Sequence, residues 1–162
     1  MRILENEIKP ENNQLLFYSG LVYEEIKPVF PDDVQEIMTL KKIAEKKASI
    51  LFTAGIVQPE PVIEYLGKFT PKIDSLLFED HHAFTSKDYG LIVQKFESSL
   101  NPADLFIVTE KDASRFMNDH HFPELLKSKT YSIPVRVEIL NKQEQLFIQK
   151  IKNYVVENSR NS

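Results

Sequence analysis

Three short apolar runs, each followed by residues of helical period, most strongly constrain how this chain folds. The runs are "SILFTAG" at 49–55, "IDSLLFED" at 73–80 and "DLFIVTE" at 104–110. Short apolar runs bounded by turn residues are typical of buried strands, and their alternation with helices is typical of a parallel sheet. We therefore expect an α/β fold with a mostly parallel open sheet, Rossmann-like and three-layered, with helices on both faces.

Helix signals follow the first two runs. Pro59 and Pro61 suit the start of a helix, because proline is tolerated in a first turn, and Gly67 suits its end. After the second run, Thr85 and Asp88 have the spacing of a capping box, in which each side chain bonds the backbone N–H of the other. These signals predict a helix between successive strands, as a parallel arrangement requires.

Segments outside the three runs predict further elements. Residues 14–30 are rich in aromatic and β-branched side chains, which indicates two short extended segments in a hairpin or a linker ribbon. Residues 31–47 begin with a proline and two acids and end with lysines, which suits either a helix dipole or a charged connector. Residues 131–140 predict a fourth strand, followed by a last helix. We expect a β-ribbon linker and charged helix or connector in 1–47, and an α/β domain in 48–162.

Composition and charge exclude several classes of protein. The chain has 162 residues, 42% of them hydrophobic and 27% charged, as in an ordinary soluble globular protein. Its formal net charge of −4 provides no broad cationic field, so we expect no nucleic-acid partner. The absence of cysteine excludes disulfides and is compatible with a reducing cytoplasm. No apolar run approaches the roughly 20 residues that cross a bilayer, so we expect any membrane contact to be peripheral.

Polar residues follow each of the three predicted strands. Gly55 ends the first run, Asp80-His81-His82 follows the second, and "TEKD" at 109–112 follows the third. In open α/β sheets, ligands bind at the carboxyl ends of the strands. We expect one candidate site at this edge, with Asp80 and His81 as catalytic residues and a substrate or nucleotide rim around them. The expected rim residues are Gly55, His82, Thr109, Glu110, Lys111 and Asp112.

All four histidines lie in Asp-His-His triplets, at 80–82 and at 119–121. An imidazole that titrates near neutrality beside a carboxylate can be oriented and made more basic, as a general base or proton relay requires. The second triplet lies in a polar connection before Pro123, away from the predicted strand ends, and we expect it to be a bystander. A metal site would need both triplets to meet, so we expect none.

Purely structural roles also account for the rim residues. Thr109 and Asp112 have the spacing of a helix capping box. Gly55 suits a tight turn between a strand and a helix. Asp80 and His81 suit an exposed surface pair, so the sequence supports both a functional and a structural interpretation of this edge.

The chain contains no Walker A phosphate loop. That motif reads G-x-x-x-x-G-K-[ST], and the candidate "GKFT" at 67–70 has Phe69 where the hydroxyl residue belongs and Val62 in place of the first glycine. We therefore expect this chain alone to bind no ATP stably.

Three stretches in register resemble a known family. "FTAGIVQPEPVIEYL", "LLFEDHHAFTSKDYGLI" and "LFIVTEKDASRF" are similar to the carboxyl-terminal half of tetraacyldisaccharide 4'-kinase of the lipid A pathway, in the form found in Bacteroidetes-type bacteria. The match spans about 48–116, and the aromatic segment before residue 30 resembles the β-ribbon linker of the family. Glu79 and Val108 depart from the family pattern, which usually has proline and threonine at these places.

The resemblance implies a kinase at the cytoplasmic face of the inner membrane. It would move the γ-phosphate of ATP, with Mg²⁺, to the 4'-hydroxyl of tetraacyldisaccharide 1-phosphate and give lipid IVA. In the family, an amino-terminal domain carries the P-loop and a catalytic acid, and a histidine of a "DH" motif works with that acid. The match falls on His81, with Asp80 as its neighbour and His82 as the other candidate. The resemblance thus implies that a P-loop domain is the missing partner and that the chain alone is inactive.

Two other classes of function fit parts of the sequence. One is a metal-dependent phosphoesterase named after an Asp-His-His motif, although such enzymes also need aspartates spaced as D-x-D, and none occurs here. The other is a non-catalytic interaction domain, in which the hydrophobic ribbon at 15–30 packs on a partner.

Overall fold

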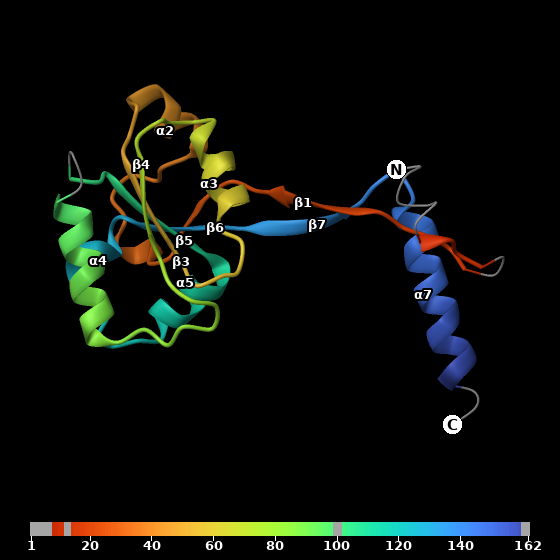
Figure 1. Ribbon diagram of the computed structural model, residues 1–162. Helices are drawn as coiled ribbons and strands as arrows, with labels where there is room; N and C mark the ends of the chain where they lie inside the picture. Colours follow the sequence, from red (N-terminus) through yellow and green to blue (C-terminus); the bar gives the residue numbers. More distant parts are fainter. Residues whose placement is uncertain (1–7, 12–13, 99–101, 160–162) are drawn as a thin grey trace. The chain divides into compact units, whose positions relative to one another are not determined.

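The computed structural model describes residues 8–11, 14–98 and 102–159 (Figure 1). These residues separate into two compact units. One unit comprises residues 23–135, and the other comprises the described residues of 1–22 and of 136–162. The expected division between residues 47 and 48 stays a prediction.

The larger unit is built on a five-stranded sheet with the strand order β2-β6-β5-β3-β4. The neighbours from β6 to β4 run parallel, whereas β2 pairs with β6 in the antiparallel direction. The strands are β2 (Lys27–Pro28), β3 (Ile50–Ala54), β4 (Ile73–Leu77), β5 (Leu105–Thr109) and β6 (Thr130–Ile133). The three apolar runs are therefore β3, β4 and β5, and the expected mostly parallel sheet is confirmed.

Helices cover both faces of this sheet. On one face, α2 (Leu40–Lys46) and α3 (Glu60–Gly67) contribute to one hydrophobic core. On the other face, α4 (Ser86–Ser98), α5 (Glu110–Met117) and α6 (Glu124–Lys127) contribute to a second core. Every residue of β3 is buried, because the strand lies inside the sheet with both faces covered. A continuous apolar run, rather than an alternating one, is the pattern that such a strand requires.

Two predicted helix starts are confirmed. α3 begins directly after Pro59, and Gly67 is its last residue. At the start of α4, the backbone N–H of Thr85 donates to Asp88 Oδ2 at 2.7 Å, and the backbone N–H of Asp88 donates to the Thr85 hydroxyl at 3.4 Å. This reciprocal pair is the predicted capping box.

The prediction of one helix across residues 31–47 is wrong in its extent. Pro31–Asp33 form a single 3-10 turn, η1, and α2 begins only at Leu40. Thr39 sets this start, because its backbone is extended and its hydroxyl accepts the N–H of Lys42 at 3.1 Å. The residues between the turn and α2 form a connector, as the alternative interpretation expects.

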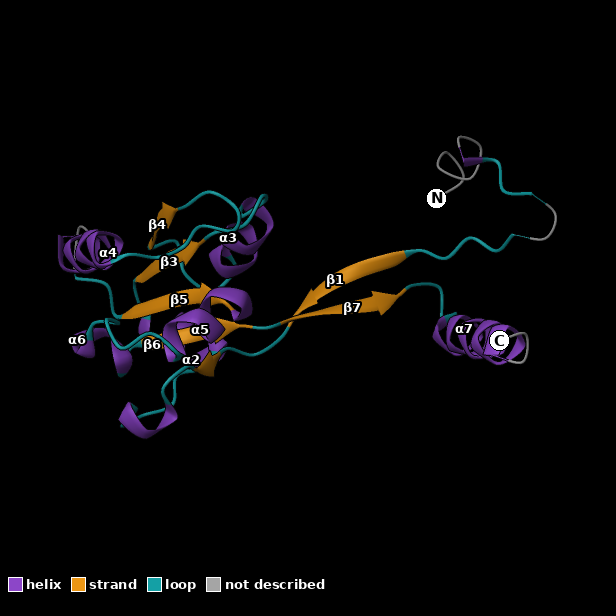
Figure 2. Cartoon of the chain, turned by 90° about the horizontal axis from the view of Figure 1, so that it is seen from below, coloured by secondary structure: helices purple, strands orange, loops and turns teal. Residues whose placement is uncertain are grey.

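A two-stranded antiparallel ribbon joins β1 (Ser19–Tyr23) to β7 (Val135–Ile139) (Figure 2). Hydrogen bonds flank the pair at both ends: Leu140 N donates to Tyr18 O at 2.8 Å, and Glu24 N donates to Pro134 O at 3.0 Å. A hairpin within residues 14–30 is therefore wrong, because β1 pairs with a strand that is distant in the sequence.

Pro134 divides the strand expected at 131–140 into two. β6 ends at Ile133 in the five-stranded sheet, and β7 begins at Val135 in the ribbon. Proline has no backbone N–H to continue a ladder of hydrogen bonds, so the chain changes sheet at this residue. The expected single strand is thus two strands of different sheets.

The predicted last helix is present as α7 (Glu144–Ser159). The ring of Phe147 packs edge-on against that of Phe17, with 5.2 Å between ring centroids. Other apolar side chains of α7, among them Ile151, Tyr154 and Val155, are exposed. Within the described ranges, no helix is long and apolar enough to cross a membrane.

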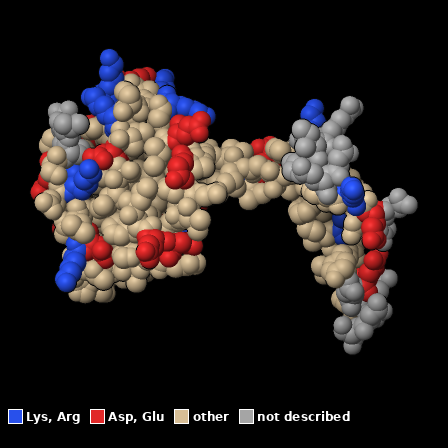
Figure 3. All heavy atoms as spheres, in the orientation of Figure 1, with Lys and Arg blue, Asp and Glu red and all other residues tan. Residues whose placement is uncertain are grey.

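Charged side chains of both signs are spread over the visible face of the larger unit (Figure 3). Lys and Arg atoms form small groups that alternate with groups of Asp and Glu atoms. Interspersed charges of this kind give the face no strong field of a single sign.

Phe116 is the centre of an aromatic cluster beneath α4, α5 and α6. Its buried ring has centroid distances of 4.7 Å to Phe84, 5.1 Å to Phe122, 5.9 Å to Tyr89 and 6.2 Å to Phe106. Because α5 contributes this ring, the cluster fixes α5 on the sheet.

The Phe116→Ala variant should lower the free energy of unfolding by about 3–5 kcal/mol, because it leaves a cavity among four other rings. Urea denaturation followed by circular dichroism measures this change. The exposed neighbour provides the control, since Met117→Ala should change the same free energy by less than about 0.5 kcal/mol. Equal effects of the two variants would contradict the central place of Phe116.

Candidate functional site

The carboxyl ends of β3, β4 and β5 meet at one edge of the sheet. Their parallel register pairs Ala54 with Leu77 and Thr53 with both Leu76 and Val108. The polar residues expected at the rim lie in the turns after β3 and β4, at the end of β5 and in the first turn of α5. The convergence predicted from the three strand ends is therefore present.

Asp112 is the buried anchor of this edge. Its side chain is fully buried, and its Oδ2 accepts hydrogen bonds from Gly55 N at 3.0 Å and from the Thr109 hydroxyl at 2.8 Å. Its Oδ1 lies 3.4 Å from Nη1 of Arg115. A buried carboxylate is stable only when such donors replace water. Asp112 therefore ties the end of β3 to the start of α5.

Thr109 caps α5. Its hydroxyl accepts the backbone N–H of Asp112 at 3.2 Å, so the helix start predicted from this spacing is correct. The Asp112 carboxylate, however, bonds the backbone of Gly55 and not that of Thr109. The second half of a capping box is thus replaced by a contact between α5 and the turn after β3.

Gly55 allows the loops after β3 and β4 to approach closely. A Cβ atom at this position would lie 3.2 Å from the carbonyl oxygen of Glu79 and 3.7 Å from the Cβ of His82. The backbone of Gly55 is not left-handed, so the need for glycine here comes from space and not from conformation.

Lys111 joins the same two loops from α5. Its Nζ donates to Gly55 O at 2.6 Å and to Asp80 Oδ1 at 2.8 Å. The hydrogen bond from Lys111 is the main reason that the pKa of Asp80 lies below its ordinary value of 3.8, and the backbone N–H of His81 lowers this pKa further. Asp80 is therefore held as a carboxylate.

His81 presents its imidazole to solvent. Its side chain is 82% exposed, and Nε2 lies 3.4 Å from Asp80 Oδ2. The backbone of His81 is left-handed, with φ of 61°, and its N–H donates to Asp80 Oδ1 at 3.0 Å. The ring is thus placed beside a fixed carboxylate and is accessible to a second molecule.

His82 has a different environment from His81. Its ring stacks on Phe78 with 4.7 Å between centroids and meets Phe84 edge-on at 5.3 Å. Nε2 lies 3.1 Å from Asp88 Oδ2 but does not align with it as a hydrogen-bond donor. The pKa of Asp88 is lowered chiefly by the hydroxyl of Thr85, and only secondarily by His82. His82 is therefore packed into the base of the loop.

Two further residues of α5, Glu110 and Arg115, have contacts at or near this edge. The exposed Glu110 accepts the N–H of Val135 through Oε2 at 3.4 Å. Arg115, which was not among the expected residues, donates from Nη1 to the carbonyl oxygen of His82 at 2.9 Å. The signal for Arg115 was its position one helical turn after Lys111, which places both on one face of α5.

The second Asp-His-His triplet lies in the turns between α5 and α6. Asp119 accepts hydrogen bonds from the Tyr89 hydroxyl at 2.6 Å and from the N–H of His121 at 2.8 Å. The bond from Tyr89 is the first cause of the lowered pKa of Asp119, whereas burial is the first cause of the raised pKa of Tyr89. Among the described residues, no group of three or more His, Asp or Glu side chains could hold a metal ion.

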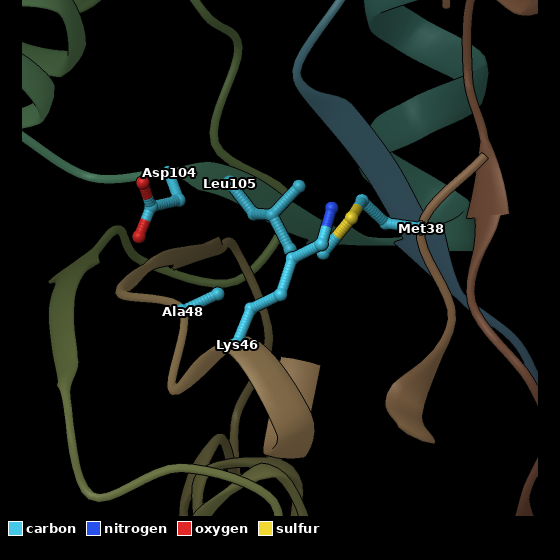
Figure 4. Close-up of a pocket in the computed structure, with 5 residues that line it drawn as sticks. All are labelled: Met38, Lys46, Ala48, Asp104 and Leu105. Atoms are coloured by element: carbon cyan, nitrogen blue, oxygen red, sulfur yellow. The ribbon is translucent and has the colours of Figure 1, made fainter. Parts of the chain in front are cut away.

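A hollow lies at the opposite edge of the sheet, where the strands begin (Figure 4). It has a volume of about 230 Å³, and a broader adjoining groove has about 380 Å³. The lining residues in Figure 4 are Met38, Lys46, Ala48, Asp104 and Leu105. The Asp104 carboxylate accepts the N–H and the hydroxyl of Ser49, at 2.7 and 2.9 Å, which fixes the start of β3. This hollow lies at the end of the sheet opposite to the loop that carries His81 and His82.

The open, mostly parallel sheet with helices on both faces defines an α/β fold, a class in which ligands commonly bind at the carboxyl ends of the strands. A sequence model of the tetraacyldisaccharide-1-P 4'-kinase family matches residues 6–155. The chain belongs to this family, so the resemblance expected from its sequence is confirmed.

Several curated relatives carry the name tetraacyldisaccharide 4'-kinase. The relative from Bacteroides thetaiotaomicron is 39% identical over 153 residues, which cover 92% of this chain and 40% of the relative. That from Phocaeicola vulgatus is 35% identical, with 100% of this chain and 43% of the relative covered. That from Bacteroides fragilis is 38% identical, with 91% and 39% covered. The chain thus spans about two fifths of the length of these relatives. No solved structure is significantly similar to it.

The Asp112→Asn variant should lower the free energy of unfolding by about 1–3 kcal/mol, because the neutral amide leaves buried donors unpaired. Urea denaturation measures the change. Glu110→Gln on the same helix is the matched control and should change this free energy by less than about 0.5 kcal/mol, because Glu110 is exposed. A tolerated Asp112→Asn substitution would contradict the anchoring role.

Asp80 should contribute to stability only while it is ionised. Its pKa is lower in the folded chain than its ordinary value of 3.8, so the contribution is present above that value and is lost as the pH falls through the folded pKa. The difference in free energy of unfolding between wild type and Asp80→Asn should therefore shrink between about pH 5 and about pH 2. Urea denaturation at several pH values measures it. In a Lys111→Met background this pH dependence should be weaker, and an unchanged dependence would argue against Lys111 as the main cause.

Proposed function

We propose that this chain supplies the carboxyl-terminal part of a kinase. The enzyme transfers the γ-phosphate of ATP to the 4'-hydroxyl of tetraacyldisaccharide 1-phosphate, giving lipid IVA. The family match and the names of the relatives support the reaction. The observation that carries the proposal for this chain is the exposed His81 beside the carboxylate of Asp80, at the edge where α/β sheets bind ligands.

The residues of this chain do not fit ATP and Mg²⁺ by themselves. The sequence has no P-loop, and the described residues include no cluster of three His, Asp or Glu side chains suited to a cation. In the proposed enzyme, a separate amino-terminal P-loop domain binds both, and this chain alone is inactive. The enzyme acts at the cytoplasmic face of the inner membrane and contacts the membrane peripherally.

His81 has the chemistry to assist the attacking hydroxyl. Phosphoryl transfer depends mainly on positioning and on charge stabilisation, and the hydroxyl must lose its proton as it attacks. We assign to His81 the task of orienting and polarising an acid of the P-loop domain that takes this proton. The neighbouring Asp80, which is held by Lys111, lies 3.4 Å from Nε2 of His81 through its Oδ2 and so supports the orientation of the ring.

A 4'-kinase assay with radiolabelled ATP and disaccharide 1-phosphate tests the proposal. The chain is assayed alone, mixed with a separately expressed P-loop domain of the family, and fused to that domain. Activity that requires the P-loop domain supports the proposal. Activity of the chain alone would contradict the placement of the ATP site, and an inactive, folded fusion would argue against the kinase function.

In the active fusion, His81→Ala should lower kcat by roughly 100-fold or more, because the acid that takes the proton loses the group that orients it. His120→Ala is the matched control, because it lies in the second triplet, away from the strand ends, and it should leave kcat unchanged. Steady-state kinetics measures both variants. Equal losses, or no loss in either, would count against the assignment of His81.

The second candidate function is that of a non-catalytic domain that binds a protein partner. Apolar side chains are exposed on the ribbon, at Leu21 and Val137, and on α7, at Ile151, Tyr154 and Val155. Such exposed apolar groups favour a protein partner. A chain that binds the P-loop domain in analytical ultracentrifugation, but whose His81→Ala variant retains full activity in the fusion, would support this alternative. No observation favours a metal-dependent phosphoesterase.

A further inference from the structure

We propose that Lys111 and Arg115 are positioning residues that together clamp the loop carrying His81. This inference rests on the proposed function, in which His81 takes part in phosphoryl transfer. Lys111 holds the loop through the side chain of Asp80, one residue before His81. Arg115 holds it through the carbonyl oxygen of His82, one residue after His81. The two contacts therefore bracket the exposed imidazole.

The two cations act from one face of one helix. They are four residues apart on α5, so their side chains project from successive turns on the same side. The opposite side of α5 is fixed, because Ala113 and Phe116 are buried in the core. The buried Asp112 adds the contact to Gly55. The clamp thus has a rigid base.

The backbone at His81 needs such a clamp. Its φ of 61° is left-handed, a conformation that costs free energy for a residue other than glycine and persists only where the surroundings impose it. The bond from His82 N to Glu79 O, at 3.1 Å, closes the turn locally. Lys111 and Arg115 attach this turn to the rest of the edge.

The contacts favour positioning over direct binding of a phosphate. Nζ of Lys111 already has two oxygen acceptors, at 2.6 and 2.8 Å. Nη1 of Arg115 lies 2.9 Å from His82 O and 3.4 Å from Asp112 Oδ1. A phosphate ligand would have to displace these oxygens, and the loop would then lose its attachments.

Nitrogen-15 relaxation on the 162-residue chain tests the clamp without any activity. In the wild type, the backbone amides of His81 and His82 should have order parameters of about 0.85. In Lys111→Met and in Arg115→Met, these order parameters should fall below about 0.6. Amides of β3 and β5 should not change. Lys41→Met, at a site on α2 where the side chain is 85% exposed, is the matched control, and Arg115→Lys should keep the loop ordered.

Arg115 also contacts the buried Asp112, so Arg115→Met should lower the free energy of unfolding as well. Lys111→Met should weaken the fold less, because the Lys111 side chain is 37% exposed and its loss leaves no buried charge. Unchanged order parameters at His81 and His82 in Lys111→Met would overturn the clamp. This result is independent of the kinase assay.

Kinetics of the fusion tests the consequence for the reaction. Lys111→Met should lower kcat by up to roughly 100-fold, as misplacement of a catalytic group does, while KM for both substrates stays within about twofold. Arg115→Lys should restore most of the kcat lost in Arg115→Met. One combination of results would overturn the positioning role of Lys111. In it, Lys111→Met keeps full kcat although its loop is mobile, while His81→Ala is inactive. Full kcat in His81→Ala would instead contradict the proposed function, and relaxation would still decide the clamp.

Discussion

The buried carboxylate of Asp112 is the constraint on which the carboxyl edge of the sheet depends. A charge in the interior is tolerated only when donors surround it. Here the donors come from three places: the turn after β3 through Gly55, the cap of α5 through Thr109, and the next turn of α5 through Arg115. Each donor can reach the carboxylate only if its own element is correctly placed. The position of α5 and the path of the β3 turn are therefore coupled.

Exposure increases outward from this anchor in a regular way. Asp112 is fully buried, Lys111 and Asp80 are about one third exposed, and His81 is 82% exposed. The contacts that hold the loop are thus made by residues partly shielded from water, where hydrogen bonds between charges are less screened. The imidazole of His81 itself remains accessible to a second molecule. Such an arrangement combines a rigid support with an accessible imidazole, which suits a site completed by another domain.

The sheet was predictable because its strands are buried on both faces and read as continuous apolar runs between helix caps. The meeting of Gly55, Asp80 and Lys111 followed from the rule that parallel strand ends share an edge. The partner of β1 was not predictable, since pairing between distant segments depends on the assembled fold and not on local pattern. Arg115 was missed for a similar reason, because its carbonyl partner at His82 is visible only once α5 and the loop are placed.

The pairing of β1 with β7 has a consequence for the order of folding. It closes a loop of about 110 residues, from Glu24 to Pro134, and the entropy that this closure costs is recovered only when the ribbon forms. The strands from β3 to β6 are joined by much shorter segments, so their contacts can form first. The ribbon, like the similarly distant pair of β2 with β6, then assembles after them. In a chain still emerging from the ribosome, β3, β4 and β5 would be available to pair before β6 and β7, which emerge together because only Pro134 separates them.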